Sequence, residues 1–220
     1  MNDNLALEKK ILEQKRKDIL NEVEQKKRYQ EEIQKKLISV TKEAKGSYSQ
    51  EKENTEKIYM LLKKEIENYE EALKNPYFGR VDFDEKFGSQ EKIYIGKKGI
   101  TSTYDGEEIV VDWRAPVADL YYSGTGGEAY YKAPMGVVEG DLNLKRKFLY
   151  NEENLSKIFD EGTNEIIING EEGEGLVDEF LKINLEESRG KKLKEVVATI
   201  QKEQNDIIRW PKNLPIIVQG

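Results

Sequence analysis

Three glutamates lie close together near a break between two helical patterns. Glu51, Glu53 and Glu56 follow the polar stretch 46–49, where the first pattern stops and the second begins. Clustered carboxylates can pair with basic groups of a partner, although most such runs are solvated surface. We treat these three residues as candidate partner-binding residues at the tip of a helical arm.

The side-chain types that are missing exclude several chemistries. The 220 residues include no histidine and no cysteine, which excludes imidazole bases, imidazole ligands, disulfides and thiolate metal sites. The net charge is −7 and there is no Lys/Arg block, so the expected partner is a protein and not free nucleic acid. No apolar stretch resembles a signal peptide or a membrane span, which predicts a cytoplasmic protein that does not engage a membrane.

Three further motifs have structural explanations. Asp112, Trp113 and Arg114 can form a buried ion pair stacked on an indole, and we favour a structural pin. The glycine-rich stretch 124–127 lacks the Lys-Ser/Thr ending of a phosphate loop and predicts a turn. The acidic stretch 169–175 lacks the ligand pattern of an EF-hand and predicts a loop. We therefore expect no catalytic residue and no metal ligand in this chain.

Heptad periodicity predicts the element that carries the three glutamates. Apolar residues recur every seven positions at Leu5, Leu12, Ile19, Ile33 and Val40, with Lys26 in the missing place. A second helical pattern runs through Ile58, Leu62, Ile66, Tyr69 and Leu73 and ends before Pro76. Two helices joined by a short polar turn predict an antiparallel coiled-coil hairpin over residues 1–75. The alternative reading is that these helices dimerise with a second chain or lie on the protein's own surface.

The texture changes after Pro76 to short β-branched and aromatic runs separated by glycine. Strands are expected within 77–83, 92–103, 107–111, 117–122, 129–132 and 145–150, with Asp105-Gly106 as the best hairpin turn. These runs predict a small antiparallel β-rich module over 76–168. The fold class is therefore α+β.

The last segment, 169–220, has the order in which a P-loop domain begins. A helical pattern is followed by the apolar run 214–218, which reads as a buried parallel strand, and then by Gly220. We expect the truncated start of an α/β P-loop (RecA-like) domain, so that the chain is an incomplete protein.

Residues near this end resemble a known group of enzymes. Ile200, Gln201 and Gln204, the last of which is sixteen residues before Gly220, resemble with that glycine the Q motif and first strand of UvrD/Rep-type superfamily 1 helicases. The resemblance implies that Gln204 contacts the adenine edge and that Gly220 is the first glycine of the Walker A motif. ATP and Mg²⁺ are then cofactors of the full-length parent, a hydrolase, whereas the fragment binds neither and is inactive because later motifs are missing.

The remaining motifs narrow the resemblance to the HelD group of helicase-like proteins. The segments 75–83, 94–96, 112–116 and 145–146 are similar to the amino-terminal region of that group, preceded by a coiled-coil arm. The resemblance implies a factor that docks on bacterial core RNA polymerase through the secondary channel and releases or recycles it using ATP. Glu51, Glu53 and Glu56 would then form the arm tip. The alternative is a UvrD/Rep-type DNA helicase acting in unwinding or repair, against which the balanced charge of the arm speaks.

Overall fold

The computed structural model describes residues 2–43, 49–124 and 126–161. Gln204, Gly220 and the P-loop segment expected over 169–220 lie outside these ranges. Two long N-terminal helices precede a series of strands, so the fold is α+β, as predicted. Two compact units are distinguished. We call Met1–Tyr77, Gly96–Asp112 and Leu149–Lys157 the arm unit, and Phe78–Ile95, Trp113–Phe148 and the residues from Ile158 the sheet unit.

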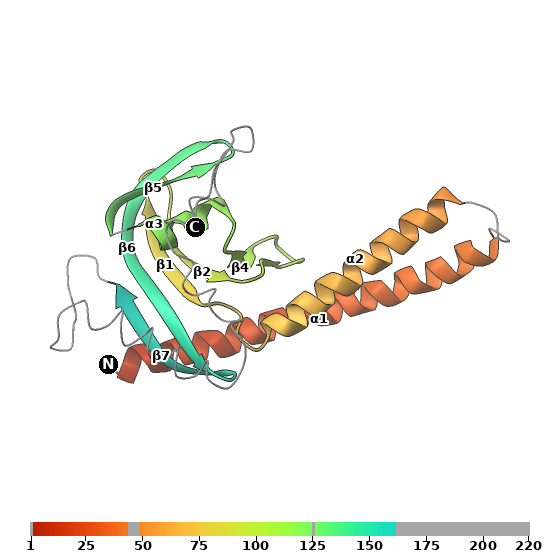
Figure 1. Cartoon of the computed structure of the whole chain (residues 1–220), viewed down its shortest axis with the longest axis horizontal. Coiled ribbons are helices and arrows are strands. Elements are labelled where there is room, and N and C mark those ends of the chain that lie inside the picture. The colour runs from red at the N-terminus through yellow and green to blue at the C-terminus, as the bar shows by residue number, and fades with distance from the viewer. Residues whose placement is uncertain (1, 44–48, 125, 162–220) are drawn as a thin grey trace, which may run out of the picture. The chain divides into compact units, whose positions relative to one another are not determined.

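The arm unit contains helices α1, Asn2–Glu43, and α2, Gln50–Ala72, which lie side by side (Figure 1). They are antiparallel, because Lys26 pairs with Glu65 whereas the later residue Lys36 pairs with the earlier residue Glu51. Ser49 caps α2 by accepting a hydrogen bond from the Lys52 amide at 3.3 Å. Acidic residues in the first turn of α2 favour the same helix start, since they face the positive end of its dipole.

A short hairpin also belongs to the arm unit. Strands β3, Ile100–Thr101, and β4, Glu108–Asp112, pair antiparallel with Ile100 opposite Val110. The predicted turn at Asp105-Gly106 is confirmed. Gly106 has φ +78°, and the Asp105 carboxylate accepts a hydrogen bond from the Glu107 amide at 3.1 Å.

The sheet unit is built from long antiparallel pairs. Strand β1, Gly79–Glu85, lies between β2, Gln90–Gly96, and β6, Gly136–Asn151. Strand β5, Gly127–Ala133, and strand β7, Asn154–Glu161, both pair with β6, and the unit boundary falls within β2, β6 and β7. One face forms the core, with Val81, Phe83, Ile93, Ile95 and Leu142 all buried.

The strand predicted over 117–122 is wrong. These residues form a 3-10 turn, Pro116–Ala118, followed by a short helix α3, Asp119–Ser123. Proline is favoured at the first helical position, and the buried residues Ala118, Leu120 and Tyr121 have the spacing of one helical turn and not of a strand. The run predicted over 92–103 is also divided, since β2 ends at Gly96 and β3 begins at Ile100.

Candidate functional site

The heptad residues of α1 form the seam of the arm. The exposed fractions are 3% for Leu12, 0% for Ile19, 9% for Ile33 and 7% for Val40. On α2 the buried positions are Thr55, Leu62, Ile66, Tyr69 and Ala72. Ile58, expected in this row, is instead 41% exposed, because Thr55 takes the inward place one turn earlier. The seam is thus filled by the two helices of one chain.

Lys26 interrupts the apolar row without leaving a buried charge unpaired. Its ammonium nitrogen lies 3.1 Å from a Glu65 carboxylate oxygen and 5.2 Å from the centroid of the Tyr69 ring. An ion pair and a cation–π contact together compensate the desolvation of the ammonium group. A heptad position filled by lysine is therefore tolerated here because α2 supplies matched partners.

The three tip glutamates are each paired with a lysine of the arm. Glu51 contacts Lys36 across the hairpin at 3.1 Å, Glu53 contacts Lys57 at 2.6 Å, and Glu56 contacts Lys52 at 3.7 Å. Residues 53 and 56 lie about one turn apart on one side of α2, whereas Glu51 faces α1. The structure places the three residues in the same two turns but does not gather their carboxylates.

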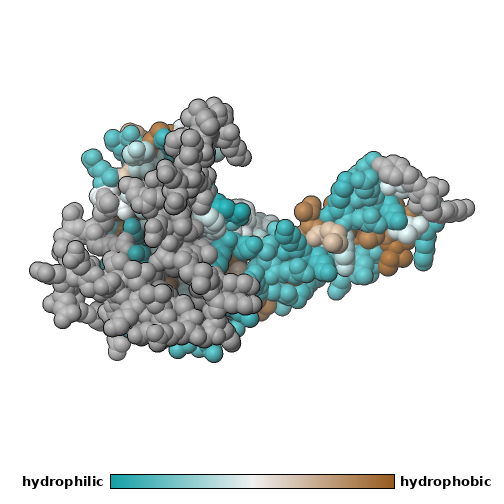
Figure 2. Space-filling model, in the orientation of Figure 1, coloured by the Kyte–Doolittle hydropathy of each residue, from teal (hydrophilic) through white to brown (hydrophobic). Residues whose placement is uncertain are grey.

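A shallow groove follows the outer side of α2. Its described lining residues are Glu53, Glu56, Lys57, Met60, Leu61, Lys63, Lys64 and Glu67. Met60 is 61% exposed and Leu61 is 68% exposed. Figure 2 shows that hydrophilic side chains dominate the visible surface of both arm helices, with small hydrophobic areas between them. The upper arm therefore presents charged groups of both signs around two apolar side chains.

The base of the arm is held by a single arginine. The Arg16 guanidinium donates to the backbone oxygen of Leu73 at 2.9 Å and also to the backbone oxygens of Lys74 and Glu153. Leu73 and Lys74 follow the end of α2, where carbonyl groups lack helical partners, and Glu153 lies in the β6–β7 turn. Three backbone segments of the arm unit are thereby joined by one side chain of α1.

Polar contacts join the β3–β4 hairpin to α1. The Thr103 amide donates to Glu22 at 3.1 Å, the Thr103 hydroxyl donates to Gln25 at 2.6 Å, and the Lys15 ammonium donates to the Ile109 oxygen at 2.6 Å. Burial lowers the pKa of Lys15, although the negative charges of Asp18 and Glu8 raise it. We call these contacts the base latch.

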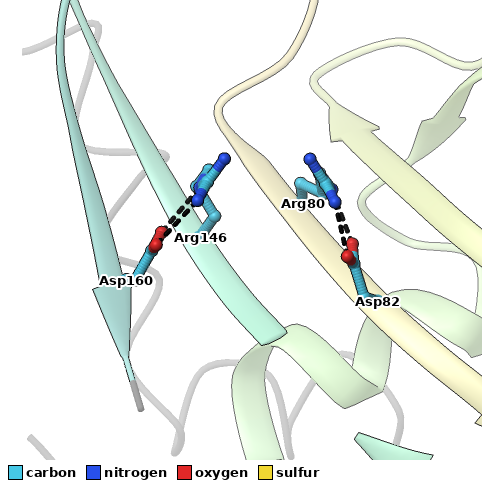
Figure 3. A network of polar contacts seen from close by, with 4 residues as sticks. All are labelled: Arg80, Asp82, Arg146 and Asp160. Atoms are coloured by element: carbon cyan, nitrogen blue, oxygen red, sulfur yellow. Dashed lines mark hydrogen bonds and ion pairs between the residues drawn. The ribbon is translucent and has the colours of Figure 1, made fainter. Parts of the chain in front are cut away.

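The sheet unit contains two buried arginines that the sequence reasoning did not identify. Arg80 on β1 lies directly opposite Arg146 on β6, and each is 5% exposed. Figure 3 shows each guanidinium turned to its own carboxylate, Arg80 to Asp82 and Arg146 to Asp160. Both contacts are bidentate, the geometry that arginine and carboxylate groups prefer.

An aromatic stack completes this network. The Arg80 guanidinium carbon lies 5.6 Å from the centroid of the Tyr94 ring, which stacks on Phe148 at 6.2 Å. One signal for it was available in the sequence, since Arg80 and Asp82 alternate on one face of a predicted strand. Asp160 could not have been found in this way, because its place opposite Arg146 depends on long-range strand pairing.

The remaining predicted motifs give a mixed outcome. Arg114 is exposed, so the buried position expected for this arginine is wrong. Strand β5 begins at Gly127, the last glycine of the stretch 124–127, so the stretch is not followed by the helix that a phosphate loop requires. Within the described residues, no group of three or more acidic side chains is arranged to hold a metal ion.

The sequence of this chain matches a known protein family. The family model described as DNA helicase IV HelD, N-terminal domain, matches residues 5–174. The chain belongs to this family. The matched HelD segment includes α1 from Leu5 onward, all of α2 and every described strand. No curated protein matches the chain in a sequence search.

The described helices were also compared with the requirements of a membrane span. Neither α1 nor α2, nor any shorter helix in the described ranges, combines the length and the apolar character needed to cross a bilayer.

Proposed function

We propose that the α1–α2 arm is the docking element of a HelD-type factor that binds bacterial core RNA polymerase and releases or recycles it. The observation that supports this proposal is that the apolar seam between α1 and α2 is buried within one chain and that hydrogen bonds hold the base of the arm. A probe that enters a channel of a partner must keep its direction without a second chain. The base latch and Arg16 supply that support within the arm unit.

The closed seam argues against dimerisation through the heptads. Ile19 and Val23 are 0% and 2% exposed within a single chain, so a partner helix would have to displace α2 to reach them. Formation of a dimer would therefore begin by opening a packed hairpin. A monomeric arm agrees better with these burial values.

The charge of the arm favours a protein partner over a nucleic acid. Residues 1–75 carry 17 Lys/Arg and 16 Asp/Glu, and the tip glutamates already alternate with lysines. A strand-tracking surface needs an excess of positive charge along the phosphates. Paired charges near exposed Met60 and Leu61 instead resemble the rim and centre of a protein interface.

We extend the proposal to the parent protein, in which ATP hydrolysis drives release. Gln204 would contact adenine and Gly220 would begin the phosphate loop, with Mg²⁺ held by residues beyond this chain. Glu51, Glu53 and Glu56 would contact basic groups of the secondary channel by exchanging their lysine partners. No catalytic role is assigned to these three carboxylates.

A pull-down with purified bacterial core RNA polymerase tests this function. The chain is compared with a variant in which residues 30–61 are replaced by a four-residue glycine-rich turn, which leaves Arg16, Glu22, Gln25 and Lys26 in place. We expect binding by the complete arm and loss of binding by the shortened arm. Equal binding by both would assign docking to another surface, and tight, salt-sensitive binding to single-stranded DNA would favour the DNA-helicase alternative.

A further inference from the structure

Strand β5 comes last in the strand order β3-β4-β2-β1-β6-β5 of the described residues. Among the described strands it pairs only with β6, and none of its residues is buried. The β5–β6 hairpin closes through Pro134 and Met135, and Met135 is fully exposed. An edge strand of this kind presents backbone donors and acceptors on its outer side, to which another strand can be added.

One face of this edge carries a row of carboxylates. Glu128 on β5 lies directly opposite Asp141 on β6, and Asp141 lies directly opposite Asp84 on β1. All three side chains are exposed, and none forms an ion pair with a described residue. Directly opposed like charges destabilise a sheet, so this row works against the stability of the isolated unit.

Exposed apolar side chains share the face with the row. Tyr130 lies opposite Glu139, and Val137 lies opposite Lys132, which places all four beside the carboxylates by strand alternation. Tyr130 is 60% exposed and Val137 is 57% exposed. The face therefore offers apolar contacts next to unneutralised negative charge.

The charge around this edge selects the class of partner. Residues 84–91 and 127–141 contain six acidic residues against two lysines. One of these lysines, Lys86, is paired with Glu139. Its ammonium nitrogen lies 3.7 Å from the Glu139 carboxylate, and its backbone amide donates to the Glu139 backbone oxygen at 3.0 Å. Such a surface repels phosphate groups and attracts a basic polypeptide.

We propose that the outer edge of β5, which pairs with no second strand among the described residues, receives an extended basic segment of a partner protein as an additional strand. Alternate residues of that segment fall on the face of Glu128, Tyr130 and Lys132. A lysine or arginine beside Glu128 neutralises the row, and the next basic residue on the same face packs its aliphatic stem and charge against the Tyr130 ring. This surface is separate from the arm and does not depend on polymerase docking by it.

Binding of labelled peptides to the full chain tests the proposal. The probe has four Lys-Val repeats, and a peptide of four Lys-Pro repeats has the same charge but lacks half of the backbone donors. We expect the Lys-Val peptide to bind at least about tenfold more tightly in fluorescence polarisation. Hydrogen exchange should then show slower exchange of the amides of residues 127–133.

Two charge variants locate the contact. Glu128→Lys should weaken binding of the Lys-Val peptide at least about tenfold, whereas Glu31→Lys, the same change on the exposed side of α1, should leave it unchanged. Glu128→Lys should fold, because it places a lysine opposite Asp141. Equal binding of both peptides, no protection of residues 127–133, or equal losses in both variants would overturn the proposal. Protection of the same residues by a single-stranded oligonucleotide would also overturn it.

Discussion

The ion pairs of the arm tip and those of the sheet unit differ in exposure and geometry. Lys36 and Glu51 have side chains that are 54% and 60% exposed, and the pair links two helices through one contact. Arg80 and Asp82 are 6% and 13% exposed and form two parallel hydrogen bonds. Both regions are charged, but only the sheet unit removes its charges from water.

This difference indicates what each region is suited for. An exposed ion pair contributes little to stability and can exchange its partner at small free-energy cost. A buried bidentate pair fixes the strands that carry it, and loss of one member leaves a desolvated charge. The upper arm is accordingly suited to contact a partner, and the sheet unit is suited to hold a fixed geometry.

The largest expected effect is that of Arg80→Ala. This change leaves the Asp82 carboxylate buried without its bidentate partner and should lower the free energy of unfolding by about 3–5 kcal/mol. Urea unfolding followed by circular dichroism measures the loss. The double variant Arg80→Met with Asp82→Leu is the control, and it should recover most of the stability because both charges are removed. A single variant as stable as the wild type would contradict the difference between the two regions.

Arg146→Ala should have a smaller effect than Arg80→Ala. Its partner Asp160 has a 39% exposed side chain, so water replaces much of the lost interaction. We expect a loss of about 1–3 kcal/mol in the same urea measurement. A loss equal to that of Arg80→Ala would show that exposure of the carboxylate does not decide the outcome.

Two isoleucine substitutions compare the packing at the base of the arm with the packing in its upper part. Ile19→Ala should cost about 2–5 kcal/mol, because the side chain is fully buried near the base latch. Ile33→Ala removes the same atoms higher in the arm, where the residue is 9% exposed, and should cost less. Thermal unfolding of the two variants provides the test. A larger loss at Ile33 would mean that the upper arm, and not its base, carries the rigidity.

Glu51→Gln at the tip should change stability by less than about 1 kcal/mol. The Lys36–Glu51 pair is exposed on both sides, so solvent replaces the contact. The melting temperature should remain close to that of the wild type, while polymerase binding falls. Glu31→Gln on α1 is a matched control, and an equal loss of binding in this variant would remove any special role for the tip.

The smallest effect concerns the turn between β3 and β4. Hydrogen bonds from the Ser102 hydroxyl and the Glu107 amide lower the pKa of Asp105 below its usual value. The folded state thus favours the ionised carboxylate, which contributes to the free energy of unfolding. This contribution is present above the ordinary pKa of about 4 and is lost as the pH falls through the lowered pKa of the folded state. Asp105→Asn should keep the turn but lose this pH dependence, whereas Asp105→Ala should lose both. Melting curves of the three proteins between neutral and acidic pH measure the difference.

Much of the arm could be predicted from local sequence. Leu12, Ile19, Ile33 and Val40 repeat with a period that only a helix seam satisfies, and all four are buried. Ile58 could not be placed correctly, because its exposure depends on how α2 rotates against α1. The ion pair and the cation–π contact of Lys26 could not be predicted either, because its partners Glu65 and Tyr69 come from the other helix.

The sheet unit was less predictable because its contacts are long-range. The Asp105-Gly106 turn of the arm unit was evident from two adjacent residues, whereas the pairing of Arg146 with Asp160 in the sheet unit follows from strand register. The run 117–122 has the β-branched and aromatic character of a strand, but Pro116 and the tertiary burial of Leu120 and Tyr121 favour a helical turn. Predictions for Gln204 and Gly220 stay untested, since both residues lie outside the described ranges.

Photo-crosslinking from the outer side of the arm tests the central claim most directly. A photoreactive amino acid is placed at Leu61, which borders the groove on α2, or at Leu20 on α1, which is 46% exposed near the base. Each variant is mixed with bacterial core RNA polymerase and irradiated. A docking arm predicts strong crosslinks from position 61 to residues lining the secondary channel and weak ones from position 20. Crosslinks from position 20 alone, or none from position 61 in a chain that still binds, would contradict docking through the upper arm.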